Sequence, residues 1–237
     1  MPAAPTLAVL HGLRLGSVVR VDDLARRTGL PSGEVSAQLA AALERGWVRH
    51  YEGRLPGWSL TRSGREEGER LLAEELDAAG AREAVAAVHA EFVPLNARVL
   101  EVCTAWQVVV RDGVEVPNDH RDEAYDAAVL ERLAALHASA RPLLRRLSAA
   151  LERFRGYDPR LEAALERTLA GDVEWFTRPT IDSYHTVWFE LHEDLLATLG
   201  LRREGERSAT AVVRGARAAS PTDRAAGRLD GTHQELA

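Results

Sequence analysis

The chain has 237 residues, enough for one or two domains of ordinary size. Hydrophobic residues make up 46% and charged residues 28%, values typical of a soluble globular protein rather than a disordered or fibrous one. No apolar run is long enough to span a membrane, no signal-peptide pattern opens the chain, and the single cysteine, Cys103, excludes an intramolecular disulfide. We therefore expect a cytoplasmic protein without a membrane partner.

The net charge of −6 is distributed unevenly. Residues 1–65 contain nine arginines and five acidic residues, a balance of +4, which leaves −10 for the remainder. Basic charge concentrated in one segment is typical of a surface that meets nucleic-acid phosphates. The N-terminal segment is therefore the candidate for such a surface.

Three stretches near the N-terminus have apolar residues at helical spacing: 6–13, 21–30 and 31–48. Gly29 and Gly46 are stop signals for the second and third helices. In the third helix Ser32 is a candidate N-cap, and we expect a buried stripe of Val35, Leu39, Ala42 and Leu43. Residues 47–61 alternate in polarity on both sides of "EGRLPG", which predicts a β-hairpin.

From about Glu66 onward the periodicity is almost wholly helical. The predicted helices are 66–92, 94–110, 122–154, 158–171 and 173–199. "RDGVEVPND" and "RGYDP" are the expected breaks, with Asp119 or Asp122 as candidate N-cap, and Pro179 marks a bend or start in the last helix. Residues 203–237 have no apolar stripe and are predicted to be disordered.

The stretch "VDDLARRTGLPSGEVSAQLAAALERGWVRHYEGRLPGWSLTRSGREEGERLL", in the N-terminal third, resembles the winged helix-turn-helix of MarR-like and PadR-like bacterial transcription regulators. "LARRTGLP" resembles the supporting helix and turn, "SGEVSAQLAAALERGWV" the recognition helix, and "WSLTRSGR" the end of the wing. The resemblance implies binding of double-stranded DNA and regulation of transcription.

In such a protein the start of the recognition helix enters the major groove. The candidate DNA-binding residues there are Ser32, Glu34, Ser36 and Gln38, of which Gln38 suits adenine. Arg49 and Arg54 in the wing, and Arg26 and Arg27 on the supporting helix, are candidates for phosphate contacts. The family often places arginines where Ala37 and Gln38 stand, which puts affinity or base choice in doubt. A winged helix that binds another protein is the alternative.

The helical body is larger than DNA binding requires, so we expect it to form a homodimer, to bind a small-molecule effector, or both. Polar and aromatic residues share apolar helical faces and are candidates for an effector pocket: Asn96, Trp106, Gln107, Trp175, Tyr184, His185, Trp188, Phe189 and His192. The alternative is that these residues are ordinary core, and the pattern leaves both open.

Metal binding is a lesser alternative. His185 and His192 are two helical turns apart, about 10 Å, which is too far for one ion. Asp182 and His185 could share a metal, and this region faintly resembles the ligand-binding domain of GntR-type regulators, but the further histidines of that family are absent. The acidic "NDHRDEAYD" stretch fits a helix start better than a calcium loop. We expect no metal and no cofactor.

No phosphate loop, nucleophile elbow or metalloprotease helix occurs, so we expect no enzymatic activity. The predicted fold is mainly α, an N-terminal winged helix-turn-helix with a two-stranded β wing followed by an all-α helical domain. Its expected parts are a DNA-binding domain at 1–65, a helical effector-binding or dimerisation domain at 66–202 and the tail at 203–237.

Overall fold

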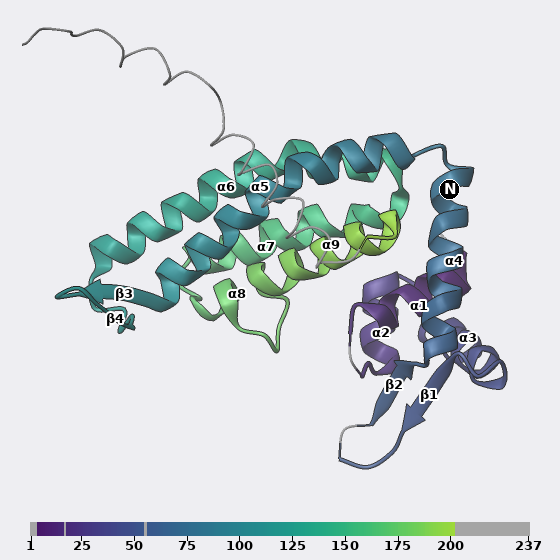
Figure 1. Cartoon of the computed structure of the whole chain (residues 1–237). Helices are drawn as coiled ribbons and strands as arrows, with labels where there is room; N and C mark the ends of the chain where they lie inside the picture. The colour runs from purple at the N-terminus through teal and green to yellow at the C-terminus, as the bar shows by residue number, and fades with distance from the viewer. Residues whose placement is uncertain (1–3, 17, 55, 202–237) are drawn as a thin grey trace, which may run out of the picture. The chain divides into compact units, whose positions relative to one another are not determined.

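The chain folds mainly into helices, as the computed structural model describes for residues 4–16, 18–54 and 56–201 (Figure 1). Three helices and a two-stranded antiparallel sheet come first, and a helical region follows, which confirms the predicted fold class. The described residues up to Gly200 belong to one compact unit, and the boundary at residue 65 stays a prediction. The predicted disordered tail, 203–237, lies outside the described residues.

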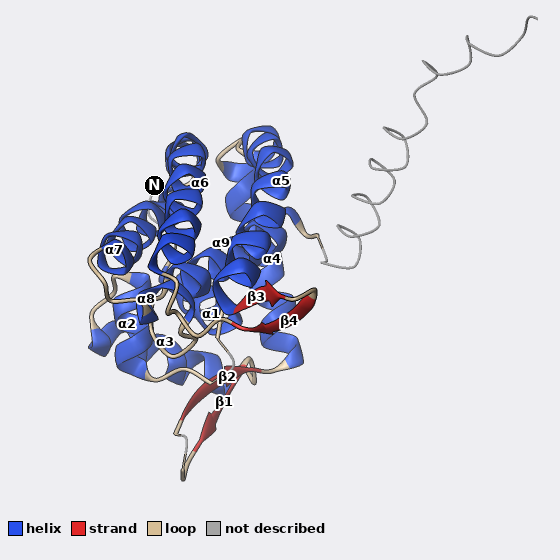
Figure 2. Ribbon diagram, turned by 90° about the vertical axis from the view of Figure 1, so that its left-hand side faces the viewer, coloured by secondary structure: helices blue, strands red, loops and turns tan. Residues whose placement is uncertain are grey.

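The N-terminal part has the element order of a winged helix: α1 (Pro5–Arg14), α2 (Val21–Thr28), α3 (Ser32–Glu44), β1 (Val48–Tyr51) and β2 (Gly57–Leu60). The two strands pair antiparallel, with Val48 opposite Leu60, and Val19 adds a bridge to Trp58. Figure 2 shows this hairpin in red, extending from the helices. A small core holds these elements together: Val9, Leu10, Leu13, Val19, Leu24, Val35, Leu39, Ala42 and Val48.

Helix α3 differs from its prediction at two positions. Pro31, and not Ser32, is the N-cap residue, and no side chain caps this helix. Leu43 is 46% exposed instead of buried. The buried stripe packs against α1 and α2, and Leu43 lies about 100° further round the helix than Ala42, which turns it away from both. Gly46 follows the helix with φ of 69°, as its predicted role as a stop requires.

Helix α4 (Arg62–Ala78) begins against the turn between α3 and β1. The Thr61 hydroxyl accepts a hydrogen bond from the Gly64 N–H and donates one of 2.7 Å to the Gly46 carbonyl. Gly64 packs on the backbone of Trp47, so that a Cβ added to it would lie 1.8 Å from the Trp47 carbonyl oxygen. The glycine of "LTRSG" is therefore required by close packing.

Four helices form a bundle: α5 (Arg82–Gln107), α6 (Glu123–Ala150), α7 (Tyr157–Leu169) and α9 (Tyr184–Leu199). Helices α5 and α7 each pack against both α6 and α9, around one large apolar core. A 3₁₀ turn, η1 (Glu152–Gly156), and the short α8 (Glu174–Thr177) complete this part. Among the described helices, none combines the length and the apolarity that crossing a bilayer requires.

The first break in the helical body lies earlier than predicted. Helix α4 ends before Gly80, which has φ of 59°, and α5 then continues through Pro94. Pro94 is exposed, so the hydrogen bond lost with its N–H lies on the solvent side of the helix.

The predicted break at 111–119 contains a second hairpin, formed by β3 (Val108–Arg111) and β4 (Val114–Pro117). Asp112 and Gly113 form its two-residue turn, with φ of 53° and 77°. An Asp-Gly pair between apolar-rich runs is a hairpin signal that the helical reading of this region overlooked. The next helix, α6, begins as expected, because the Asp122 side chain accepts a hydrogen bond from the Tyr125 N–H.

Candidate functional site

The wing, defined as the β1–β2 hairpin and its turn, presents exposed arginines. Arg49 lies on β1 and Arg54 lies in the turn, and both are exposed. Arg65, in the first turn of α4, is also exposed. Within the described ion pairs none of these three has a carboxylate partner. The structure therefore places the predicted wing arginines where a phosphate backbone can reach them.

The exposed face of α3 is made of small side chains. Ser32, Ser36, Ala37 and Ala40 are exposed, and the Ser36 hydroxyl donates to the Ser32 carbonyl. Glu34 is half-buried.

Gln38, predicted to read a base, turns toward α1, and its amide oxygen accepts a 2.8 Å hydrogen bond from the Thr6 hydroxyl. That prediction is corrected. The sequence signal for this inward orientation was the position of Gln38, three residues after the buried Val35 and four before the buried Ala42.

The two arginines of α2 have different environments. Arg26 is exposed and pairs with Asp23. Arg27 is mostly buried, and it donates to Glu190 of α9 at 2.6 Å and to the Gly12 carbonyl at 3.2 Å. The predicted phosphate contact of Arg27 is therefore corrected, because its guanidinium is directed into the protein. Its place three residues after the buried Leu24 put it on the inner face of the helix.

Most of the predicted effector pocket is packed core. The Trp188 ring stacks on Phe92 at 4.8 Å between centroids, and its Nε1 donates to the Asn96 amide oxygen at 3.0 Å. His192 is buried and lies 5.4 Å from the same Phe92 ring. The polar groups on this face thus help fix helix packing.

The other predicted pocket residues are scattered. Tyr184 and Trp106 are fully or nearly buried in the bundle core, and His185 is half-buried. Phe189 and Gln107 are exposed, so neither lies on the buried face that its helical spacing predicted. Burial lowers the pKa of His185. Of the predicted set, Trp175 alone lines the cavity described below.

The described residues contain no cluster of three or more metal-ligating side chains. Asp182 instead accepts from Arg160, and the acidic stretch before α6 is engaged in Asp119–Arg111 and Asp126–His120 pairs. Cys103 is buried, which raises the pKa of its thiol to about 12 and suits an unreactive core residue.

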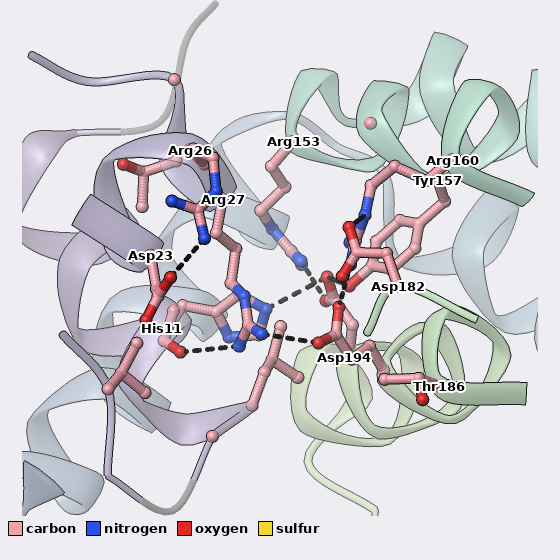
Figure 3. Close-up of a pocket in the computed structure, with 18 of the residues that line it drawn as sticks. His11, Asp23, Arg26, Arg27, Arg153, Tyr157, Arg160, Asp182, Thr186 and Asp194 are labelled. Atoms are coloured by element: carbon pink, nitrogen blue, oxygen red, sulfur yellow. Dashed lines mark hydrogen bonds and ion pairs between the residues drawn. The ribbon is translucent and has the colours of Figure 1, made fainter. Parts of the chain in front are cut away.

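A cavity of about 1150 Å³ lies between the winged helix and the bundle (Figure 3). Its walls come from α1, α2, the start of α7, the segment before α9 and α9 itself. Charged side chains predominate among those labelled in Figure 3: Asp23, Arg26, Arg27, Arg153, Arg160, Asp182 and Asp194. No pattern in the sequence pointed to this cavity.

Glu190 joins the two sides of the cavity. Its side chain is buried on α9, and its two oxygens accept from different helices, Oε1 from Arg27 of α2 and Oε2 from Arg160 of α7 at 2.8 Å. Arg160 also donates to Asp182 at 3.0 Å. We call these four residues the Glu190 cluster.

Asp194, one turn further along α9, forms a second buried cluster. It pairs with Arg153 of η1, accepts from the Tyr157 hydroxyl at 2.9 Å, and lies 3.1 Å from Nε2 of His11 on α1. Burial alone would raise the pKa of Asp194, but Arg153 and His11 outweigh burial and hold it well below its usual value. Arg153 also donates to Glu75 of α4.

Neither cluster was predicted, because each joins residues far apart in the sequence.

A search of protein-family models, of curated proteins and of solved structures finds no match for this chain.

Proposed function

We propose that the protein is a DNA-binding transcription regulator whose winged helix grips duplex DNA chiefly through phosphate contacts. The observation that carries the proposal is a set of exposed arginines with no carboxylate partner among the described residues: Arg49 and Arg54 in the wing and Arg65 beside it. The balance of +4 over residues 1–65 supports attraction to the phosphate backbone.

The small side chains on α3 support backbone-dominated binding rather than extensive base reading. Ser36, Ala37 and Ala40 allow the helix to approach the groove closely, but none has the long forked side chain that recognises a base in two places. Because Gln38 is held by Thr6, it is not assigned a base contact. Sequence preference is then expected to come from groove shape and from the wing.

The test is the salt dependence of duplex DNA affinity. Each phosphate contact that is lost flattens the slope of log affinity against log salt by about 0.9. Arg54→Ala and Arg49→Ala are each expected to flatten the slope by about that amount, measured by fluorescence anisotropy with a labelled duplex.

Arg82→Ala is the matched control, because Arg82 is exposed on α5 and pairs with Asp77 outside the winged helix. It removes the same charge and is expected to leave the slope unchanged. If the wing variants and the control flatten the slope equally, the change in net charge alone explains the effect, and a wing contact is contradicted. A DNA affinity that does not depend on salt would also contradict the proposal.

A protein-binding winged helix is the second candidate. The exposed Leu43 beside the small face of α3 favours it, because an apolar side chain suits a protein surface better than a phosphate backbone. The absence of measurable duplex binding at low salt would favour this candidate.

Regulation by a small molecule and homodimerisation are further parts of the proposal. Support for an effector comes from the cavity beside α2, because α2 packs against α3. A dimer would match two-fold symmetric operators, and sedimentation equilibrium tests it directly.

A further inference from the structure

We propose that the cavity between the winged helix and the bundle binds a small molecule through an oxyanion, a carboxylate or a phosphate, held between Arg27 and Arg160. The regulatory meaning of this site rests on the proposed function, whereas the binding itself does not.

Unused hydrogen-bond donors on the two arginines carry the inference. A guanidinium has five N–H donors. Arg27 uses one for Glu190 and one for the Gly12 carbonyl, and Arg160 uses one for Asp182 and one for Glu190. Both guanidiniums bind the same carboxylate, and both residues line the cavity. An oxyanion takes such donors in pairs.

Glu190 and Asp194, the two buried carboxylates of the cavity, are less available to a ligand than the arginines, and the more exposed Asp23 and Asp182 each pair with an arginine. The two oxygens of Glu190 have one arginine each, and the side chain is only 5% exposed. Asp194 is only 3% exposed and is engaged by Arg153 and Tyr157. The side chains of Arg27 and Arg160 are 23% and 26% exposed, so a ligand can reach them without opening the fold. A cationic ligand at Glu190 or Asp194 would have to displace an arginine from a buried carboxylate, which is costly.

His11 supplies an independent observation. It lines the same cavity and is only 7% exposed, yet its Nδ1 has no hydrogen-bond partner among the described residues. Buried polar atoms are rarely left unpaired, and such an atom in a cavity wall indicates a missing ligand atom or water. A molecule that reaches from Arg27 to His11 would satisfy it.

An oxyanion at this place would link two parts of the protein. Arg27 belongs to α2 of the winged helix and Arg160 to α7 of the bundle, so the ligand adds a bridge beside the one that Glu190 already makes. Its binding would therefore stabilise the present placement of α2 and change DNA affinity through that placement.

Calorimetric titration of the full-length protein with sodium phosphate and with sodium succinate, at fixed ionic strength in chloride, tests the site. We expect one saturable site per chain for at least one probe, with a dissociation constant below about 1 mM. We expect Arg27→Gln and Arg160→Gln to weaken that binding by about tenfold or more, the loss of one charged hydrogen-bond partner. Arg14→Gln, on α1 but paired with Glu69 outside the cavity, should leave it unchanged.

Hydrogen exchange on the unmodified protein gives a second readout that does not depend on a variant folding. The bound probe should slow amide exchange in residues 21–28 of α2 and 157–169 of α7, which the ligand would link. The absence of saturable heat with both probes, unchanged exchange, or an equal loss in Arg14→Gln would each overturn the inference. Neither experiment contains DNA, so a protein that binds the probe but not duplex DNA would refute the proposed function alone.

Discussion

Two glycines lie on one face of α4, and replacing each by alanine separates the effect of close packing on stability from the effect of helix propensity. Gly64 and Gly68 are one turn apart, and both are buried. A Cβ at Gly68 would meet its nearest neighbour, Leu10 Cβ, at 3.7 Å, an ordinary contact, whereas a Cβ at Gly64 would lie 1.8 Å from the Trp47 carbonyl oxygen. Gly64→Ala therefore forces α4 and the α3–β1 turn apart by more than 1 Å, because the added Cβ would otherwise overlap the Trp47 carbonyl oxygen.

The energies follow from that displacement. Overpacking typically costs about 1–3 kcal/mol. The movement also strains the 2.9 Å bond from the Thr61 N–H to the Trp47 carbonyl and the Thr61–Gly46 bond, each worth about 1 kcal/mol. Against this, alanine in a helix gains about 0.5–1 kcal/mol over glycine. We expect Gly64→Ala to lower the free energy of unfolding by about 3 kcal/mol and Gly68→Ala to raise it by up to about 1 kcal/mol.

Thermal melting followed by circular dichroism measures both variants. About 2–4 °C per kcal/mol is expected for a chain of this size, so the two melting temperatures should move in opposite directions and differ by about 10 °C. Equal melting temperatures would refute the reasoning, because they would show that the turn yields to the added methyl group without cost.

Two further predictions concern buried titratable groups. Asp194→Asn removes the charge that Arg153 and His11 face, so it should cost about 3–5 kcal/mol in urea unfolding, as the breaking of a buried pair does; a loss below 1 kcal/mol would show the cluster to be solvated. Burial lowers the pKa of His137 below its usual 6.5, so the folded state favours the neutral ring. The contribution of the neutral ring to the free energy of unfolding is complete above pH 6.5 and is lost as the pH falls through the lowered pKa. His137→Gln should therefore reduce the pH dependence of the urea midpoint measured between about pH 8 and 5.5.

Local signals were sufficient for most of the fold. Gly29 and Gly46 ended their helices as predicted, Asp122 capped α6, and alternation around "EGRLPG" located the wing, because each is decided by a few neighbouring residues. The hairpin turn at Asp112 was also signalled locally and was overlooked.

The site was less predictable, because its partners come from distant elements. Glu190 and Asp194 are four residues apart, the spacing of a solvated acidic face, and nothing near them indicates that arginines from α2 and η1 cover that face. For Trp188 and His192 the structure favours the core alternative that the pattern had left open. Trp188 and His192 meet Phe92 of α5, which fills the space where a ligand was expected.

The pairing of Arg27 with Glu190 has a consequence for how the protein is made. The two residues are 163 positions apart, so α1 to α3 leave the ribosome long before the carboxylate that neutralises Arg27 has been synthesised. Until then, Arg27 lacks the partner that holds it inward, and His11 lacks Asp194. In a nascent or truncated chain without α9, the positive charge of Arg27 is therefore not neutralised by Glu190, and the winged helix is more basic than in the finished protein. Completion of the chain weakens the electrostatic attraction of this segment to nucleic acid.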